Sequence, residues 1–314
     1  MLPKGAVIAV TYRCNSRCFH CSIWNMKDTY ETPPSFYARL PGTLREINIS
    51  GGEPFLRDDL FEICEVMDHR CRRPRILINT NGLLPDRVER VTGELLRFFR
   101  IAVRVSIDGL EQTNDRIRGV SGHFNKAVET LKRLSALGLE DIGISFTLAK
   151  GNERELMDVY KMCVEHDWDL SVTTVHSSEI YFGEPEDMLP DPVVAASSLR
   201  TLAGAMVRHI RPKWWFRARY LLELAKFIET KRRSFKCSAG QIFFFLDPRG
   251  IAYPCPILPV KLGDLNDASY EEYLLFSERA LSQVDKCGHG CFMVCTAAPY
   301  FRRYPLRSLL GVWK

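Results

Sequence analysis

Three cysteines stand close together near the start of the chain, in the segment Cys14-Asn15-Ser16-Arg17-Cys18-Phe19-His20-Cys21, here called the cysteine loop. Thiolates bind soft metals such as zinc, cuprous copper and cluster iron in preference to hard cations. Structural zinc takes four protein ligands, whereas a four-iron cluster held by three cysteines leaves one iron open to a small molecule. The spacing favours such a cluster, and the alternative is a zinc knuckle with His20 as the fourth ligand. Any fold for this chain has to arrange its other site residues around this loop.

The composition is that of a globular protein with room for one large and one small domain, because 46% of the 314 residues are hydrophobic and 26% are charged. The eleven cysteines occur without a signal-peptide layout and without an apolar run that would span a membrane. We therefore expect a soluble cytoplasmic protein whose thiols bind metal instead of forming disulfides. The net charge of +5 is mild, and we interpret it as a solvated basic surface.

Apolar, β-branched segments alternate with helix-like segments through the first half of the chain. Six strands that alternate with helices predict a parallel sheet with right-handed crossovers. The predicted strands are 6–11, 46–50, 75–79, 101–107, 141–148 and 170–175, and the predicted helices are 58–70, 85–99, 123–137 and 153–166, followed by 193–207 and 220–230.

Unusual residues follow the first four predicted strands. The strand-helix barrels assemble their active sites at the carboxyl ends of their strands, so these segments should meet at one rim. The pattern predicts an α/β protein with a partial (β/α)6 TIM-type barrel, open on one side because it has six units instead of eight. The segments are the cysteine loop, Gly51-Gly52-Glu53, Thr80-Asn81-Gly82, and Ser106 with Asp108-Gly109.

A second group of five cysteines, here called the tail cysteines, lies near the end of the chain. A predicted β-hairpin at 241–246 and 250–253 brings the first two together. The last three repeat at helical spacing and should lie on one face of a helix. Together they predict a four-thiolate site in a small hairpin-plus-helix domain, with zinc as the competitor of an iron–sulfur cluster. The tail cysteines are Cys237, Cys255, Cys287, Cys291 and Cys295.

The cysteine loop, together with Gly51-Gly52-Glu53-Pro54 about thirty residues later, resembles the radical S-adenosylmethionine (SAM) superfamily. The tail, in which Gly250 and Cys255 reproduce a Gly-x4-Cys feature, resembles the SPASM/Twitch extensions of these enzymes. A full SPASM domain has seven cysteines, so five imply the Twitch version with one auxiliary cluster and one surplus cysteine. The resemblance implies a barrel at 1–178, a helical insert at 179–236, an auxiliary-cluster domain at 237–300 and a tail at 301–314.

This resemblance implies the cofactors and the reaction. Cys14, Cys18 and Cys21 would hold a [4Fe-4S] cluster that binds SAM, and the tail cysteines would hold an auxiliary [4Fe-4S] cluster. Reductive cleavage of SAM would give a 5'-deoxyadenosyl radical that takes hydrogen from a peptide or a small metabolite. The auxiliary cluster would then assist oxidation or cross-linking. A reductant such as flavodoxin or ferredoxin would supply the electron.

The resemblance and the rim positions together give the candidate cofactor contacts. The Gly51-Gly52-Glu53 segment would face the amino group of SAM, since two glycines allow close approach and a carboxylate accepts from an ammonium. Similar enzymes use an arginine after the fourth strand to pair with the methionine carboxylate, and the resemblance implies Arg118 in this role, with Arg116 as the alternative. A planar guanidinium suits such a bidentate contact. The other candidates are Ser106 and Asp108 for ribose or methionine, Asn81 and Ser145 at the rim, and His176, Glu179 and Tyr181 on the substrate side.

Two other functions are compatible with these residues. An RNA-modifying iron–sulfur enzyme fits the mild positive charge and the basic, aromatic segment around Trp214 and Trp215. We expect that segment to pack against a neighbouring domain instead, and nucleic acid is not the expected partner. A zinc-binding interaction protein without catalysis would use both cysteine groups structurally. For the basic, aromatic segment 300–314, the alternatives are docking on the barrel and contact with a membrane surface.

Overall fold

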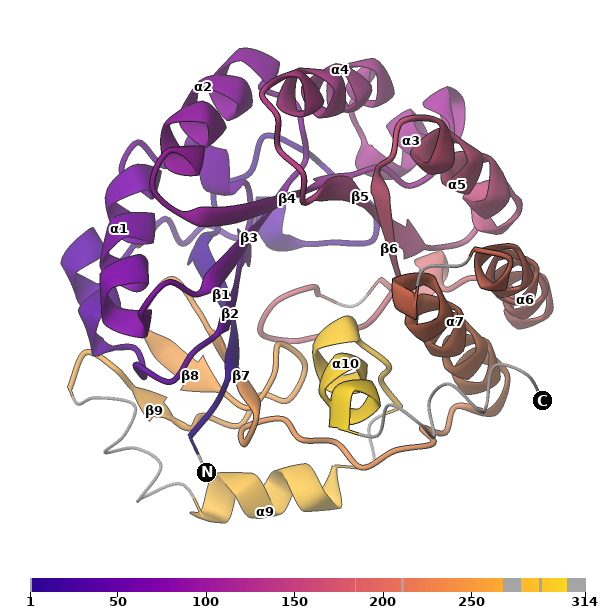
Figure 1. Ribbon diagram of the computed structural model, residues 1–314. Coiled ribbons are helices and arrows are strands. Elements are labelled where there is room, and N and C mark those ends of the chain that lie inside the picture. Colours follow the sequence, from indigo (N-terminus) through magenta and orange to yellow (C-terminus); the bar gives the residue numbers. More distant parts are fainter. Residues whose placement is uncertain (1, 184, 210–211, 268–277, 288–289, 304–314) are drawn as a thin grey trace.

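The computed structural model describes residues 2–303, apart from 184, 210–211, 268–277 and 288–289. Its strands form a curved sheet with helices along the outside (Figure 1). The strands of the barrel are β1 (Gly5–Thr11), β2 (Glu46–Gly51), β3 (Arg75–Thr80), β4 (Arg100–Ser106), β5 (Ile142–Leu148) and β6 (Asp169–Thr174). The helices between and after them are α1 (Leu60–Cys71), α2 (Pro85–Leu96), α3 (Glu111–Arg118), α4 (His123–Ala136), α5 (Leu156–Glu165), α6 (Pro192–Val207) and α7 (Pro212–Thr230).

The order of the strands is β6-β5-β4-β3-β2-β1-β7-β8-β9, and each barrel strand is parallel to its neighbours. The predicted partial (β/α)6 barrel is therefore confirmed. The hairpin near the end of the chain is also confirmed, with β8 (Ile251–Tyr253) antiparallel to β7 (Phe243–Leu246) and to β9 (Gly263–Asp264). However, β7 pairs in parallel with β1, so the hairpin continues the barrel sheet. The division at 178, 236 and 300 stays a prediction.

Successive side chains of a strand point to opposite faces of the sheet, so apolar residues face the hydrophobic core and the residues between them face the inside of the barrel. In β2, Ile47 and Ile49 are buried in the core that the strands share with the helices, whereas Asn48 between them lines a cavity. In β3, Ile78 faces the core in the same way and Asn79 the cavity. Each fully buried aliphatic side chain contributes about 1.5–3 kcal/mol to folding. This core lets the barrel keep polar residues on its inner face.

The helical insert packs as the sequence predicts. Trp214, in the first turn of α7, is buried, and its ring stacks on His209 with the centroids 5.2 Å apart. The neighbouring charges are also engaged, because Lys213 and Arg217 both bind Asp169. The aromatic segment is thus part of the packing between α7 and the barrel, which removes one of the two observations that fit an RNA substrate, the mild positive charge being the other.

The prediction of one helix for the last three tail cysteines is wrong. Cys287 follows α9 (Glu278–Lys286), Cys291 lies between helices, and Cys295 lies in the first turn of α10 (Val294–Arg303). In Figure 1, α10 lies on the open side of the ring of strands, between β7 and α7. The prediction for 300–314 falls mostly on residues beyond 303, outside the described part of the chain. No helix of the described residues has the length and apolarity to cross a membrane.

Candidate functional site

The cysteine loop follows β1, and the two glycines at the end of β2, Gly51 and Gly52, fix its first part. The backbone N–H of Gly52 donates to the carbonyl of Thr11 at 2.8 Å, and that of Glu53 donates to the carbonyl of Arg13 at 2.8 Å. Gly51 has a φ of +125°, and a Cβ there would lie 2.2 Å from the Thr11 oxygen. A Cβ on Gly52 would lie 2.1 Å from the Arg13 oxygen. Both positions therefore require glycine, since only glycine lets the two backbones come this close.

The end of α3 holds the other side of the cysteine loop. Arg17 N–H donates to the carbonyl of Arg118 at 3.1 Å, and Phe19 N–H donates to that of Ile117 at 2.9 Å. Gly119 ends the helix with a φ of +66°, and a Cβ there would lie 2.3 Å from the Arg17 oxygen. The sequence pattern does not predict α3, because residues 111–118 are mostly polar and lack apolar periodicity.

Three side chains approach the sulfurs of the cysteine loop. Ser16 Oγ lies 3.2 Å from Cys18 Sγ, and Arg118 Nη1 donates to the same sulfur at 3.6 Å. Asn81 Nδ2 lies 4.0 Å from Cys14 Sγ. Burial raises the pKa of Cys14 to about 11 and that of Cys21 to about 12. Bare thiols here would be protonated near neutral pH, so a positively charged centre is needed to hold them as thiolates.

All three cysteines of the loop line one cavity of about 290 Å³, here called the central cavity. Its walls come from the rim and the inner face of the barrel, as the strand ends predict. Of the predicted cofactor contacts, those that line it are Gly51, Gly52, Asn81, Ser106, Arg118 and Ser145. Arg116 is not among the described residues that line it, so the structure favours Arg118 of the two arginines.

Asp108 is placed differently from the prediction. Its carboxylate is fully buried behind the cavity wall and pairs with Arg118, with Oδ2 2.7 Å from Nη2. Its other oxygen accepts from the backbone N–H of Thr147 at 2.6 Å. It is not among the described residues that line the central cavity. Asp108 therefore orients Arg118, because a buried guanidinium needs a buried partner of opposite charge.

Glu53 is likewise turned away from the cavity that its neighbours line. The side chain is 1% exposed, and its carboxylate accepts from Thr80 Oγ1 at 2.8 Å, Asn81 N at 2.7 Å and Phe55 N at 3.1 Å. With these donors, it joins the end of β2 to the end of β3. The Gly-Gly-Glu pattern shows where the turn lies but not which way the third side chain points.

The burial of Glu53 gives a test by pH. Desolvation raises the pKa of its carboxyl from 4.5 to about 7 in the folded protein. Between these two values the folded state binds more protons than the unfolded state, so stability falls as pH rises. We expect Glu53→Gln to remove this part of the pH dependence of the free energy of unfolding, which is at most about 1.4 kcal/mol per pH unit. Urea unfolding from pH 4.5 to 7 measures it, and equal slopes for variant and wild type would contradict the assignment.

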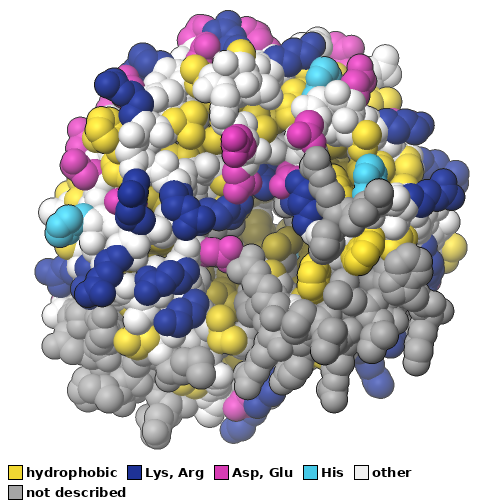
Figure 2. Space-filling model, viewed as in Figure 1, with side chains coloured by type: hydrophobic (Ala, Val, Ile, Leu, Met, Phe, Trp, Pro, Cys, Tyr) yellow, Lys and Arg dark blue, Asp and Glu magenta, His cyan; other side chains and the backbone are white. Residues whose placement is uncertain are grey.

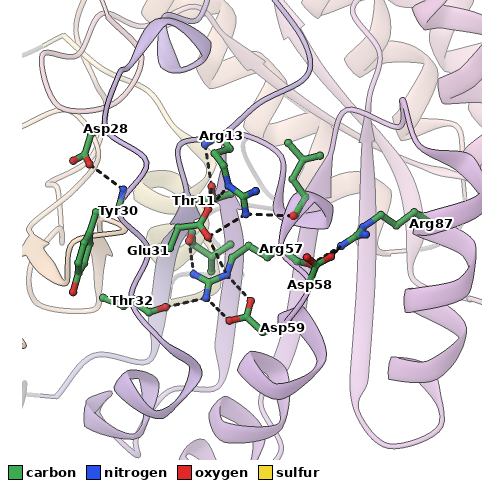
Figure 3. A network of polar contacts seen from close by, with 12 residues as sticks. Thr11, Arg13, Asp28, Tyr30, Glu31, Thr32, Arg57, Asp58, Asp59 and Arg87 are labelled. Atoms are coloured by element: carbon green, nitrogen blue, oxygen red, sulfur yellow. Dashed lines mark hydrogen bonds and ion pairs between the residues drawn. The ribbon is translucent and has the colours of Figure 1, made fainter.

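A network of ion pairs and hydrogen bonds holds the chain where it enters and leaves the cysteine loop (Figure 3). Arg13, immediately before Cys14, binds Glu31 through Nε at 2.7 Å. The guanidinium of Arg57 is buried and donates to the carbonyls of Val10 and Thr32, both at 2.9 Å. It thus ties β1 and the segment after the loop to the turn that follows β2, and this fixes the direction in which the chain enters the loop.

The inside of the barrel carries polar side chains, which the predicted strands did not lead us to expect. Asn79 Nδ2 donates to Asn48 Oδ1, and Arg104, although 5% exposed, lines the cavity and pairs with Asp141 and Asp169. The sequence feature that indicates this polar inner face is the presence of single polar residues within otherwise apolar strands. Figure 2 shows a recess at the centre of one face, surrounded by charged side chains of both signs. Further polar residues of this inner face are Ser171, Thr147 and Thr173.

The segment after β6 closes over the rim. Tyr181 is buried and lines the central cavity, and its hydroxyl lies 2.7 Å from Ser50 Oγ and accepts from Gly51 N at 2.9 Å. His176 also lines the cavity, whereas Glu179 is exposed and is not among the described lining residues. Tyr181 thus joins the segment after β6 to the glycine turn after β2.

The tail cysteines lie together. Cys237, Cys287 and Cys295 pack on an apolar cluster that includes Cys255. Burial is the largest cause of the raised pKa of Cys295, and the charges of Cys255 and Cys237 raise it further. Burial also raises the pKa of Cys291, where the charges of Cys255 and Cys237 add to the increase and the charge of Arg233 lowers it. Cys295 also lines the central cavity, so one tail cysteine shares this space with the three cysteines of the loop.

The donors present fit an iron–sulfur cluster with SAM in the central cavity. Three thiols line it, and two buried polar atoms beside them, His20 Nδ1 and Arg118 Nε, have no hydrogen-bond partner among the described residues. A polar ligand would satisfy such atoms. No three His, Cys, Asp or Glu side chains of the described chain are grouped closely enough for a single metal ion. A four-iron cluster does not require that, since each cysteine binds a different iron.

Comparisons with known proteins agree with this site. Residues 8–163 match the family model of the radical SAM superfamily. Pre-heme d1 synthase of Dinoroseobacter shibae is 31% identical over 177 residues, which cover 53% of this chain and 42% of that protein. Mycofactocin maturase MftC of Mycobacterium ulcerans is 26% identical over 326 residues, covering 95% of this chain and 84% of the relative. The chain thus spans less than half of the first relative and most of the second.

Solved structures show the same fold. SuiB of Streptococcus suis, solved with bound SAM, has a TM-score of 0.65 at 16% identity, covering 88% of this chain and 66% of that chain. The structure of anSMEcpe with bound SAM also has a TM-score of 0.65, at 18% identity, covering 87% and 80%. Identities this low show the fold alone. With a family model that matches from β1 into α5, and with its three-cysteine loop at the rim of a partial barrel, the chain belongs to the radical SAM superfamily.

Proposed function

We propose that this protein is a radical SAM oxidoreductase that modifies a peptide, with one cluster in the cysteine loop and an auxiliary cluster on the tail cysteines. The observation that carries the proposal is the shared cavity, which Cys14, Cys18 and Cys21 line at one part and Cys295 at another. A substrate bound there would be exposed to both cysteine groups. Oxidation or cross-linking of the substrate needs both a radical and an acceptor for the electron that the substrate gives up.

The chain's own residues would hold and orient the cofactor. When bound, the loop cluster with SAM supplies a 5'-deoxyadenosyl radical that abstracts hydrogen from an unactivated C–H bond. Arg118 lies at the cavity wall, held by Asp108, and would pair with the methionine carboxylate. Ser106 and Ser145 line the cavity and would contact the ribose or the methionine. Tyr181, whose hydroxyl is hydrogen-bonded to Ser50 at the rim, would help to keep water from the reacting carbon.

Three observations support a peptide as the substrate. MftC, which aligns with 95% of this chain, is named a maturase of mycofactocin. SuiB has been solved with its precursor peptide SuiA, at a TM-score of 0.61 to this chain, so a barrel of this fold accepts a peptide. The polar inner face also suits a peptide, because side-chain amides and hydroxyls can pair with its backbone groups.

The surface over the cysteine loop suits an electron donor such as flavodoxin or ferredoxin. Phe19, between Cys18 and Cys21, is 57% exposed, and Arg17 is exposed beside it. Trp24 is 40% exposed and donates to the carbonyl of Cys18 at 3.2 Å. An acidic, cytoplasmic electron carrier that docks here would come close to the loop cluster.

The direct test is cleavage of SAM. We expect the anaerobically reconstituted protein to form 5'-deoxyadenosine and methionine when it is given SAM and dithionite, and chromatography with mass detection measures both. The same protein without dithionite is the control, since cleavage needs an electron. Protein that carries iron and sulfide but forms no 5'-deoxyadenosine would overturn the proposal.

A further inference from the structure

His176 joins the rim of the barrel to the segment that carries the last tail cysteines. Its Nδ1 lies 2.7 Å from the carbonyl oxygen of Thr174, the last residue of β6. Its Nε2 lies 3.1 Å from the backbone nitrogen of Phe292. A backbone N–H can only donate, so Nε2 accepts, and Nδ1 carries the proton and donates to Thr174. Both ring nitrogens of His176 are therefore used within the chain.

Phe292 is anchored on its other side as well. Its side chain is fully buried, and its ring lies 5.3 Å from that of Tyr220, 5.7 Å from that of Phe227 and 5.4 Å from that of Phe235. Two of these three residues belong to α7. The ring thus fixes the segment to the helical insert, and the backbone N–H fixes it to the barrel.

The residues after Phe292 turn directly into the central cavity. Met293, Val294 and Cys295 all line it, and Cys291 immediately precedes Phe292. A change in the position of the Phe292 backbone would therefore move two tail cysteines relative to the cavity. The hydrogen bond to His176, two residues after the end of β6, ties this backbone to the barrel.

We propose that His176 is a positioning residue that fixes where the tail cysteines stand relative to the central cavity. This rests on the proposed function, in which those cysteines hold an auxiliary cluster that exchanges electrons with a substrate in the cavity. The structure thus gives His176 a different role from the substrate contact that its position after the sixth strand predicts. A substrate could bind its ring nitrogens only by breaking the bond to Phe292 or to Thr174.

Two substitutions separate the two bonds of His176. In His176→Gln the amide oxygen reaches the position of Nε2 and can accept from Phe292. In His176→Asn the shorter amide keeps the donor for Thr174 but does not reach Phe292. We expect amide hydrogen exchange in the peptide around Phe292, measured on the full chain as isolated, to become about two- to tenfold faster in the Asn variant and to stay near wild type in the Gln variant.

A second readout reports on the auxiliary centre itself. In a background with Cys14, Cys18 and Cys21 all replaced by alanine, iron at the tail is the only iron that the proposal expects. We expect the Asn variant to shift the midpoint potential of this centre, measured by electron paramagnetic resonance, and the Gln variant to restore it, because exposure to water and hydrogen bonding set such potentials. Exchange and potential that are unchanged in the Asn variant would overturn the role of His176. Faster exchange without iron at the tail in any variant would instead overturn the auxiliary cluster.

Discussion

Replacing Cys18 by alanine is expected to abolish reductive cleavage of SAM. Cys18 is buried at the wall of the central cavity, and its sulfur lies near both Ser16 and Arg118. Two cysteines cannot hold a four-iron cluster with one open iron, so the loop should lose its iron. We expect 5'-deoxyadenosine at the level of a reaction without protein, while about four irons per chain remain at the tail.

The matched control is Cys163→Ala. Cys163 is fully buried in the hydrophobic core, away from both cysteine groups. Its loss leaves a small cavity and lowers stability, but it should leave the iron content and the yield of 5'-deoxyadenosine per iron unchanged. Equal cleavage by the Cys18→Ala variant and wild type would show that the loop does not hold the catalytic cluster.

Replacing Asp108 by alanine is expected to destabilise the fold by about 3–5 kcal/mol, because it leaves the charge of Arg118 buried without its partner. Asp108 is 0% exposed, Arg118 is 7% exposed, and their charged atoms are 2.7 Å apart. The double variant Asp108→Ala, Arg118→Met removes both charges and should recover part of this loss. Urea unfolding monitored by circular dichroism measures the free energies of both variants.

Asp58→Ala is the matched control for this ion pair. Asp58 binds Arg87 at 2.6 Å, but its side chain is 93% exposed. Water screens such a pair, so we expect no measurable shift of the urea midpoint. An equal loss of stability in Asp108→Ala and Asp58→Ala would contradict the prediction, because it would show that the buried pair contributes no more to the free energy of unfolding than the exposed one.

The barrel could be predicted because each of its strands corresponds to a local sequence pattern. Short apolar, β-branched segments such as 75–79 alternate with amphipathic helices, and the structure has all six strands within a few residues of the predicted ranges. The rim followed from one geometric rule, that parallel strands bring their carboxyl ends together. Gly51 and Gly52 were placed at the cavity on that basis, whereas Arg118, at the end of α3, followed from the family resemblance.

The remaining features depend on packing between distant segments. The spacing of Cys287, Cys291 and Cys295 imitates a helix, but Gly288 and Gly290 lie between them, and glycine is a poor helix former. The structure accordingly places Cys291 between two helices. The burial of Glu53 away from the cavity depends on donors from β3 and the turn after it, which no local pattern of the β2 end reveals.

The most direct test of the central claim, that two clusters serve one cavity, is the iron and acid-labile sulfide content of the anaerobically reconstituted chain. We predict about eight irons and eight sulfides per chain, and about four of each when Cys255 and Cys295 are both replaced by alanine. About four irons in the wild type, unchanged by those two substitutions, would contradict the auxiliary cluster. Stoichiometric zinc without sulfide would contradict both clusters.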